Sequence, residues 1–193
     1  MALRYLTVHP LISQRWSPRA LDPAAKVTDA QLESLFEAAR WAASSGNTQP
    51  GRWLVGRRGD TAFSRIFDAL RPGNQSWAGA ASVLIVGCVV TEDETGRPMP
   101  KPDYVLGLAA QNLVLQAVAE GLVTHQMGGF SDEAIASSFE LPATARAVVV
   151  IAVGVLGSPE LLPEALAARE IAPRTRKPLS ELVFSDTWGS AAF

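Results

Sequence analysis

The segment from Asp103 to Glu120 constrains the fold of this chain more than any other stretch. Its leucine and valine side chains are spread around the helical circumference instead of forming one stripe, and Gly121 follows as a C-terminal cap. A helix that is apolar nearly all round has to be buried nearly all round. In a chain of 193 residues, this pattern predicts either a central helix or a helix packed into a subunit interface.

Two further apolar runs predict the buried part of a sheet. Ser82–Val90 is rich in β-branched residues and lacks the alternation of a half-exposed strand, which indicates a strand buried on both faces. Arg146–Leu156 predicts a second buried strand, and Gly51–Gly56 predicts a short third one. Few strands, more helix and one sheet together predict an α+β fold, with residues 1–193 as a single domain.

Local signals place the shorter helices. Thr28 and Gln31 form a capping-box pattern before a helix whose apolar residues share one face. A second helix is expected to start at Asp60 or Thr61, and a third after Ser131. Three segments are expected to lack regular structure or to end it: the first dozen residues are irregular, 71–74 ends the second helix, and Thr91–Pro102 is an exposed loop. Residues 160–170 read as weakly helical, and the chain then ends in one last helical turn near Leu179.

Composition excludes several classes of function. The formal net charge is −2, so no general attraction to nucleic acid or to an anionic membrane is implied. The longest apolar runs are shorter than the ~20 residues that span a bilayer, and the N-terminus has no long apolar segment of the kind found in secretion signals. Two histidines and one cysteine provide no metal-ligand cluster. The lone Cys88 is expected to be a buried, inert thiol, and a cytoplasmic location is expected.

The polar stretch between Arg40 and Trp53 is the first candidate site. Two serines, a glycine, an asparagine and a glutamine occur within six residues, and Pro50 then ends the run. Their amides and hydroxyls offer hydrogen-bond donors and acceptors without charge, which suits the rim of a planar, polar heterocycle. From these residues alone, an ordinary polar loop between a helix and a strand is the alternative.

Basic clusters near the two ends of the chain form the second candidate. Arg15-Trp16-Ser17-Pro18-Arg19 and 174–177 are dense in arginine, whose guanidinium fork matches phosphate oxygens. Solvated basic segments are the alternative. The pair Gly128-Gly129 permits a close backbone approach to a ligand, or makes a tight turn.

Taken together and in order, these motifs resemble the nitroreductase family of flavoproteins. The resemblance covers essentially the full chain. It is carried by Arg-x-Ser-x-Arg from Arg15, A-x-S-S-x-N-x-Q-P at 42–50, G-N-Q-x-W at 73–77, G-L-A-A-Q-N at 107–112, G-G-F at 128–130 and R-x-R-K-P-L at 174–179. It implies an α+β fold with a central, mainly antiparallel sheet flanked by helices. It also implies an intertwined homodimer with FMN at the subunit interface.

The resemblance also implies roles for individual residues. Arg15, Ser17, Arg174 and Arg176 would hold the FMN phosphate. Arg19 and Asn74 would face the pyrimidine edge, and Gly128 would direct its N–H at flavin N5. The polar loop would line the cofactor from the partner subunit. The complete predicted cofactor-binding set is Arg15, Trp16, Ser17, Arg19, Ala43, Ser44, Ser45, Asn47, Gln49, Asn74, Met127, Gly128, Gly129, Arg174 and Arg176.

The activity implied is ping-pong hydride transfer through flavin N5. NAD(P)H is the expected reductant, and nitroaromatics, quinones or other electron-poor small molecules are the expected acceptors. No catalytic side chain is required; His125, near the glycine pair, is the one candidate for an acid. An FMN-binding storage or redox-sensing module, or a specialised flavin enzyme on the same scaffold, are the alternatives. Ala43 stands where the family usually has proline, Gly51 where an aromatic residue often occurs, and Trp16 where a basic or polar one is frequent, so the substrate class stays open.

Overall fold

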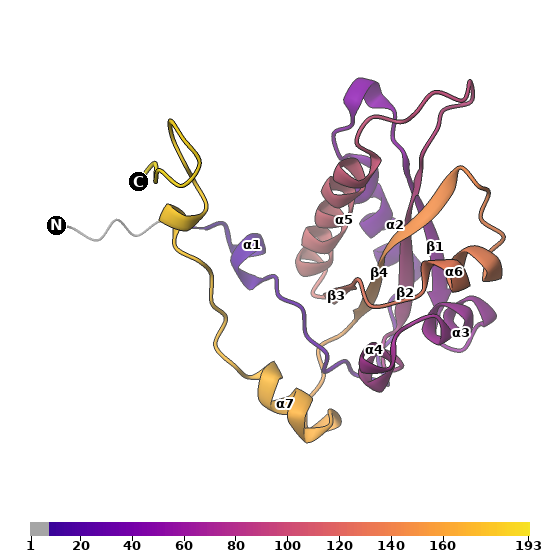
Figure 1. The fold of residues 1–193 in the computed structure, drawn as a ribbon. Coiled ribbons are helices and arrows are strands. Elements are labelled where there is room, and N and C mark those ends of the chain that lie inside the picture. Colours follow the sequence, from indigo (N-terminus) through magenta and orange to yellow (C-terminus); the bar gives the residue numbers. More distant parts are fainter. Residues whose placement is uncertain (1–7) are drawn as a thin grey trace.

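Four antiparallel strands form the central sheet of the protein (Figure 1). The structure is a computed structural model that describes residues 8–193. Along the sheet the strands follow the order β1-β2-β4-β3, and each neighbouring pair is antiparallel. The strands are β1 (Gly51–Arg57), β2 (Val83–Val90), β3 (Val123–Met127) and β4 (Ala145–Gly154). The predicted α+β class with a mainly antiparallel sheet is confirmed.

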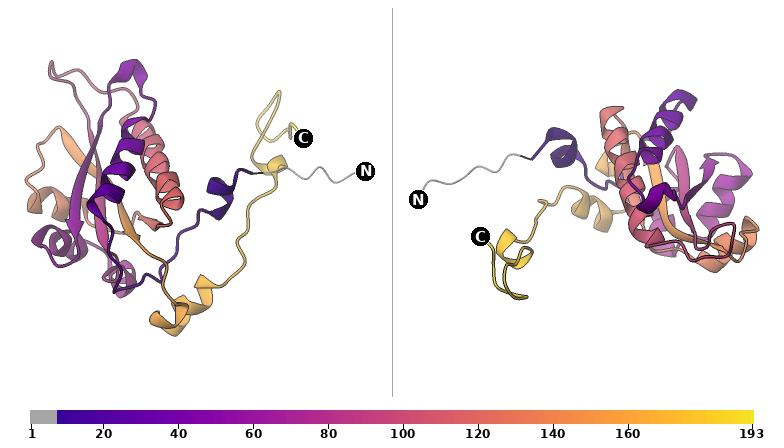
Figure 2. Two further views of the ribbon diagram at one scale, coloured as in Figure 1. Left: turned by 180° about the vertical axis from the view of Figure 1, so that it is seen from behind. Right: turned by 90° about the horizontal axis from the view of Figure 1, so that it is seen from above.

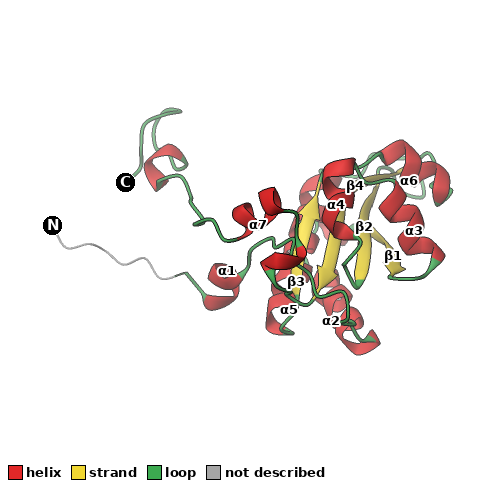
Figure 3. Ribbon diagram, turned by 90° about the horizontal axis from the view of Figure 1, so that it is seen from below, coloured by secondary structure: helices red, strands yellow, loops and turns green. Residues whose placement is uncertain are grey.

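Helices cover both faces of this sheet. One face carries α2 (Asp29–Arg40) and α5 (Pro102–Ala119), and the other carries α3 (Thr61–Asp68), α4 (Pro72–Ala78) and α6 (Asp132–Ser138), as Figures 1 and 3 show. The two apolar clusters of the core correspond to these two layers. The sheet therefore lies between two layers of helix.

The middle strands are buried on both faces, as their composition predicts. In β2, Leu84 and Val86 pack into the cluster under α3, α4 and α6, whereas Val83 and Ile85 pack into the cluster under α2 and α5. Cys88 belongs to the first cluster and is buried. Burial raises the pKa of its thiol to about 11, so it is protonated near neutral pH and unreactive.

Helix α5 is only partly covered. Leu106, Leu113 and Ala117 are fully buried against α2 and the sheet. A second stripe at helical spacing is only partly covered within the described residues: Tyr104 is 68% exposed, and Leu115 is half-buried beside Leu11. The predicted burial of α5 on nearly all sides is therefore observed only where the helix faces α2 and the sheet. An apolar stripe of the helix faces outward.

Helix starts follow the predicted capping residues. The Thr28 hydroxyl accepts from the Gln31 N–H, and the Gln31 side chain accepts from the Thr28 N–H, which completes the capping box of α2. The Asp60 and Ser131 side chains cap α3 and α6. Gly121, which follows α5, has φ +72°, a conformation that glycine adopts without strain.

Three short elements differ from the sequence expectations. Residues 10–14 form α1 (Pro10–Gln14) where an irregular segment was expected; residues 1–7 of that segment lie outside the described residues. Residues 72–78 form α4 instead of a simple helix end, because Pro72 is placed at its first turn and Trp77 is buried. Strand β3 carries polar residues and is recognisable only from its pairing with β4.

The terminal segments project from the body beside α5 (Figures 1 and 2). After β4 the chain forms η2 (Pro159–Leu161), α7 (Glu164–Glu170) and η3 (Leu179–Glu181). The polar loop between α2 and β1 contains η1 (Ser45–Asn47). Among the described residues, no helix has the length and apolar composition needed to cross a membrane.

Close packing of α3 on β1 requires a residue without a side chain at Gly56. A Cβ at this position would lie 2.3 Å from the Phe63 backbone nitrogen, and the helix backbone cannot move aside locally. We expect Gly56→Ala to lower the free energy of unfolding by about 2–3 kcal/mol. Gly73→Ala is the matched control, because a Cβ there meets nothing within 4 Å. It should leave the value unchanged or raise it by up to about 1 kcal/mol. Urea unfolding of the two variants at one protein concentration tests this, and equal stability would contradict it.

Candidate functional site

The two basic clusters converge on one cavity. Arg15, Arg174 and Arg176 line a space of about 780 Å³ together with Gln111 of α5 and Gln126 of β3. None of the three guanidinium groups forms an ion pair with a carboxylate anywhere in residues 8–193. A cavity with three cations and no anion is suited to an anionic ligand.

Direct contacts hold the two arginine segments together. Arg174 Nη1 donates to the carbonyl oxygen of Arg15 at 3.0 Å, and Arg174 Nη2 donates to that of Ser13 at 2.8 Å. Arg15 Nη1 donates in turn to Ser17 Oγ at 3.3 Å. The serine of the Arg-x-Ser-x-Arg motif therefore contacts a residue of the cavity, although neither Ser17 nor the neighbouring Trp16 lines it.

The charges in this cavity repel one another. Burial, followed by the neighbouring guanidiniums of Arg176 and Arg174, lowers the pKa of Arg15 below its ordinary value. The group nevertheless stays protonated near neutral pH, since an arginine does not lose its proton under such conditions. A bound anion would relieve this repulsion, and the cluster gains most from a ligand with more than one negative charge.

The glycine turn begins two residues beyond Gln126. Asn74 Nδ2 donates to the carbonyl oxygen of Gly129 at 2.9 Å, and the Arg71 N–H donates to the same oxygen at 3.0 Å. A Cβ at Gly129 would lie 2.9 Å from Asn74 Nδ2, so a side chain here would push Asn74 away. Gly128 is exposed, whereas Met127 is buried. The structure thus brings Asn74 to the turn and leaves the backbone of Gly128 accessible.

His125 fixes the N-terminal segment to β3. Its Nδ1 lies 3.1 Å from the Pro18 carbonyl oxygen, and its ring packs on Trp77 with centroids 4.6 Å apart. Burial is the largest cause of a pKa below the ordinary value of 6.5, so the neutral form dominates near pH 7. A carbonyl can only accept, so Nδ1 carries the proton and donates it to Pro18. His125 is therefore a structural residue and a poor candidate for an acid.

Arg19 directly follows Pro18, the residue that His125 contacts. Its N–H donates to Glu170 Oε1 at 2.8 Å, and its side chain lines a cavity of about 210 Å³ with Gln75 and Trp77 of α4. Arg19 thus lies against α4, the helix that contains Asn74, but Asn74 does not line this cavity.

The polar loop is a strained turn that bonds to itself. Gly46, Asn47 and Gln49 all have φ between +45° and +58°, which is uncommon for residues with side chains. Ser44 Oγ accepts from the Gln49 N–H at 3.2 Å, and Gln49 Nε2 donates to Asn47 Oδ1 at 3.0 Å. Conformations of this kind persist where the surroundings hold them, and they concentrate at functional sites.

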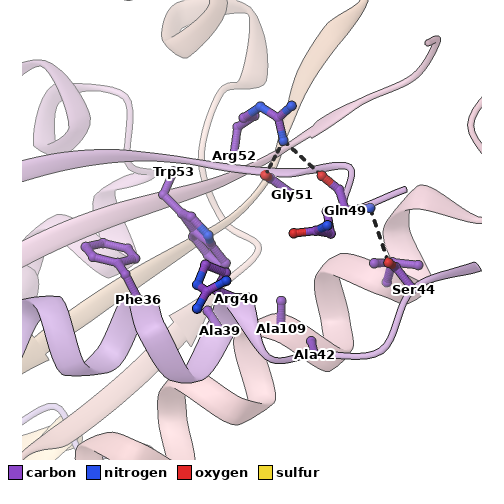
Figure 4. Close-up of a pocket in the computed structure, with 11 residues that line it drawn as sticks. Phe36, Ala39, Arg40, Ala42, Ser44, Gln49, Gly51, Arg52, Trp53 and Ala109 are labelled. Carbon is purple, nitrogen blue, oxygen red and sulfur yellow. Dashed lines mark hydrogen bonds between the residues drawn. The ribbon is translucent and has the colours of Figure 1, made fainter. Parts of the chain in front are cut away.

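Two cavities flank this loop. One of about 340 Å³ lies between α2, β1 and α5, where Phe36 and Trp53 pack with ring centroids 6.0 Å apart and Gly51 leaves the wall without a side chain (Figure 4). The other, of about 380 Å³, is lined by Ala43, Ser44, Ser45 and residues at the start of α5, including Lys101 and Tyr104. Neither cavity includes an arginine of the terminal clusters, so within one chain the loop and the arginine cavity remain separate.

Sequence reasoning missed three residues of the site. Gln111 and Gln126 line the arginine cavity, and Glu170 holds the segment at Arg19. Gln126 could have been found from its place just before the glycine pair. Nothing in the sequence distinguishes Glu170 from the other acidic residues near it.

Comparisons with known proteins agree with this fold. A sequence model described as "Nitroreductase family" matches residues 12–75 and 57–155. A crystal structure described as an oxidoreductase containing FMN superimposes with a TM-score of 0.90 and 30% identity, over 96% of this chain and 95% of that one.

Two curated proteins are also similar. An uncharacterised 15.4 kDa protein of Mycolicibacterium smegmatis is 37% identical over 147 residues, which are 72% of this chain and 98% of that one. A protein of Rhodopseudomonas palustris strain TIE-1, provisionally named an NADH dehydrogenase/NAD(P)H nitroreductase, is 27% identical over 132 residues, or 58% of this chain and 67% of that one.

The structure is an α+β protein in which three arginines from the two terminal segments line one cavity. With the family match over most of its length, the chain belongs to the nitroreductase family.

The depressed pKa of His125 predicts a pH effect on stability. The unfolded chain binds a proton below about pH 6.5, whereas the folded protein resists doing so; stability contributed by the neutral ring is complete above pH 6.5 and is lost as the pH falls below it. When the pH is lowered from 7.5 to 5.5, the free energy of unfolding should fall less for the His125→Gln variant than for the wild type. The slopes of the two pH profiles should differ by at most about 1.4 kcal/mol per pH unit.

His9→Gln is the control, because these are the two histidines of the chain and His9 is exposed. Urea unfolding at several pH values measures both variants. Parallel pH profiles for the wild type and His125→Gln would contradict the assignment.

Proposed function

We propose that this protein is an FMN-dependent oxidoreductase that takes hydride from NAD(P)H and passes it to an electron-poor small molecule. Family membership and the similarity to an FMN-containing oxidoreductase support a flavin-dependent reaction. The single observation that carries the proposal is the arginine cavity, which holds three guanidinium groups without a carboxylate and adjoins the strand that leads to Gly128. Residues 1–193 act as one domain in this proposal.

The residues in the cavity fit the phosphate of FMN. Arg15, Arg174 and Arg176 supply charge, and Ser17 lies within hydrogen-bond distance of Arg15. A phosphate monoester carries between one and two negative charges at pH 7, which suits a cluster whose own charges repel. The ring would extend from there along the end of β3 towards Gly128, with Arg19 and Asn74 at its polar edge.

The working unit in this proposal is a homodimer. The polar loop does not reach the arginine cavity of its own chain, and the apolar stripe of α5 with Tyr104 and Leu115 is only partly covered. Packing this stripe against a second copy would bury it and would let Ser44, Ser45 and Asn47 of one chain complete the site of the other. A free energy of about 25 cal/mol for each Å² of buried apolar surface favours that arrangement.

FMN, when bound, supplies two-electron hydride transfer at N5 between NAD(P)H and an acceptor. The protein contributes position and charge. The backbone N–H of Gly128 is accessible for N5, and the positive charge of Arg19 favours negative charge on the polar edge of the ring. His125 does not supply a proton, because its Nδ1–H is donated to Pro18; solvent fills that role.

The acceptor is proposed to be a nitroaromatic, a quinone or another electron-poor molecule that takes the place vacated by the nicotinamide. The segment between β2 and α5 spans only residues 91–101 and folds back on itself through a bridge between Glu92 and Pro98. A connection this short does not form a large cover over the site, which favours a broad range of acceptors.

A visible spectrum of the purified protein, loaded with FMN, tests the proposed reaction. We expect flavin absorbance that bleaches within seconds to minutes after anaerobic addition of NADH or NADPH, and that returns when a quinone is added. Protein that takes up no FMN would overturn the cofactor assignment. Protein that binds FMN but stays yellow with both nucleotides would contradict a reductase and leave a flavin-binding protein without turnover.

Arg176 offers a clean test of the phosphate site, because its one hydrogen bond within the described residues is to the adjacent Thr175 carbonyl. We expect Arg176→Gln to weaken FMN binding about 10- to 100-fold, as befits one charge-assisted hydrogen bond, while riboflavin binding stays unchanged. Lys177→Gln is the control, since Lys177 lies next to it but pairs with Glu181. Fluorescence titration of the protein with each flavin measures both affinities. Equal losses for FMN and riboflavin would show that Arg176 does not bind the phosphate.

A further inference from the structure

Two terminal segments run side by side in opposite chain directions near the arginine cavity, and two charged side chains join them. At one end, the Arg174 guanidinium donates to the carbonyl oxygens of Ser13 and Arg15. At the other end, Glu170 Oε1 accepts from the N–H groups of Arg19 and Ala20 at 2.8 and 2.9 Å. A cation thus binds the acceptors of the N-terminal segment, and an anion binds its donors.

Glu170 is an unusual residue for this task. It is 7% exposed, and it forms no ion pair with an arginine, lysine or histidine of residues 8–193. Its second oxygen, Oε2, is buried without a hydrogen-bond partner among these residues. A buried carboxylate is unfavourable unless strong contacts compensate. It is also the last residue of α7, where negative charge opposes the helix dipole. The two backbone N–H groups are the contacts that retain it.

Glu170 lies where it can control how the two arginine-bearing segments align. The residues it binds begin four positions after Arg15, and it lies four positions before Arg174. Both cationic residues meet in the cavity, where burial, followed by repulsion from Arg176 and Arg174, lowers the pKa of Arg15. Like charges oppose the association of the two segments, so the Glu170 contacts outside the cavity add to the Arg174 hydrogen bonds in holding them in register.

We infer that Glu170 is the positioning residue that sets the register of the two segments and thereby assembles the arginine cavity. It does not touch the proposed ligand; it acts through the backbone of Arg19 and Ala20. The inference rests on the proposed function for its ligand, FMN, but not for its structural part. His125 supports the same segment from β3 through Pro18 and is the second, weaker attachment.

Three variants test the inference. Glu170→Ala removes both hydrogen bonds, Glu170→Gln keeps a neutral acceptor of the same shape, and Glu164→Ala removes an exposed carboxylate from the same helix as a control. Two hydrogen bonds to a charged group predict that Glu170→Ala weakens FMN binding about 100-fold and Glu170→Gln about 10-fold. Riboflavin, which lacks the phosphate, should lose at least tenfold less affinity than FMN in Glu170→Ala. Glu164→Ala should match the wild type.

Hydrogen exchange of the cofactor-free proteins gives a readout that does not depend on flavin. The N–H groups of Arg19 and Ala20 should exchange at least about tenfold faster in Glu170→Ala than in the wild type, with Glu170→Gln between them and the strand amides of β2 unchanged. Circular dichroism identifies a variant that fails to fold, and Glu170→Gln then replaces Glu170→Ala in every comparison.

The outcomes separate the two ideas. If the wild type binds no FMN but exchange at Arg19 and Ala20 accelerates in the variants, the proposed function fails and the positioning role stands. If exchange is unchanged, or if Glu170→Ala weakens FMN and riboflavin equally in a folded protein, the positioning role is overturned. Loss of FMN affinity relative to riboflavin, together with faster exchange at the two amides, supports it.

Discussion

Repulsion among three arginine side chains is the physical constraint on which the proposed site depends. Arg15, Arg174 and Arg176 share a cavity without a carboxylate, and burial with mutual repulsion lowers the pKa of Arg15. Such a cluster stores unfavourable electrostatic energy until an anion enters. Hydrogen bonds that Arg174, Glu170 and His125 form with backbone atoms hold the terminal segments in place against this repulsion.

The sheet supplies the rigid frame to which these segments attach. Strand β3 presents His125 and Gln126 on one side of the site and leads directly into the glycine turn that Asn74 of α4 holds. Strand β3 pairs with residues 150–154 of β4, which are all buried, and this pairing holds its backbone in place. The site thus combines a rigid strand with two arms whose register is set by charged side chains, and its geometry depends on both.

The division of the predicted site between two places in one chain explains the proposed dimer. The strained loop at Ser44–Gln49 lies beside the start of α5, whereas the arginine cavity adjoins Gln111 further along the same helix. The partly covered stripe of α5 runs between them, with the exposed Tyr104 at one end. A second copy packed on this stripe would bring the loop of one chain to the cavity of the other.

Much of the fold could be predicted from the sequence, because its signals are local. Capping residues such as Thr28 fix helix starts, and the β-branched run of β2 predicts a strand buried on both faces. The motif order indicated the family, and with it the cofactor residues. Strand β3 could not be predicted, because its polar residues become a strand only through pairing with β4. The structural roles of Asn74, His125 and Glu170 were likewise visible only in the tertiary structure. These roles arise from contacts between segments up to 151 positions apart, and composition and periodicity report only on neighbours along the chain.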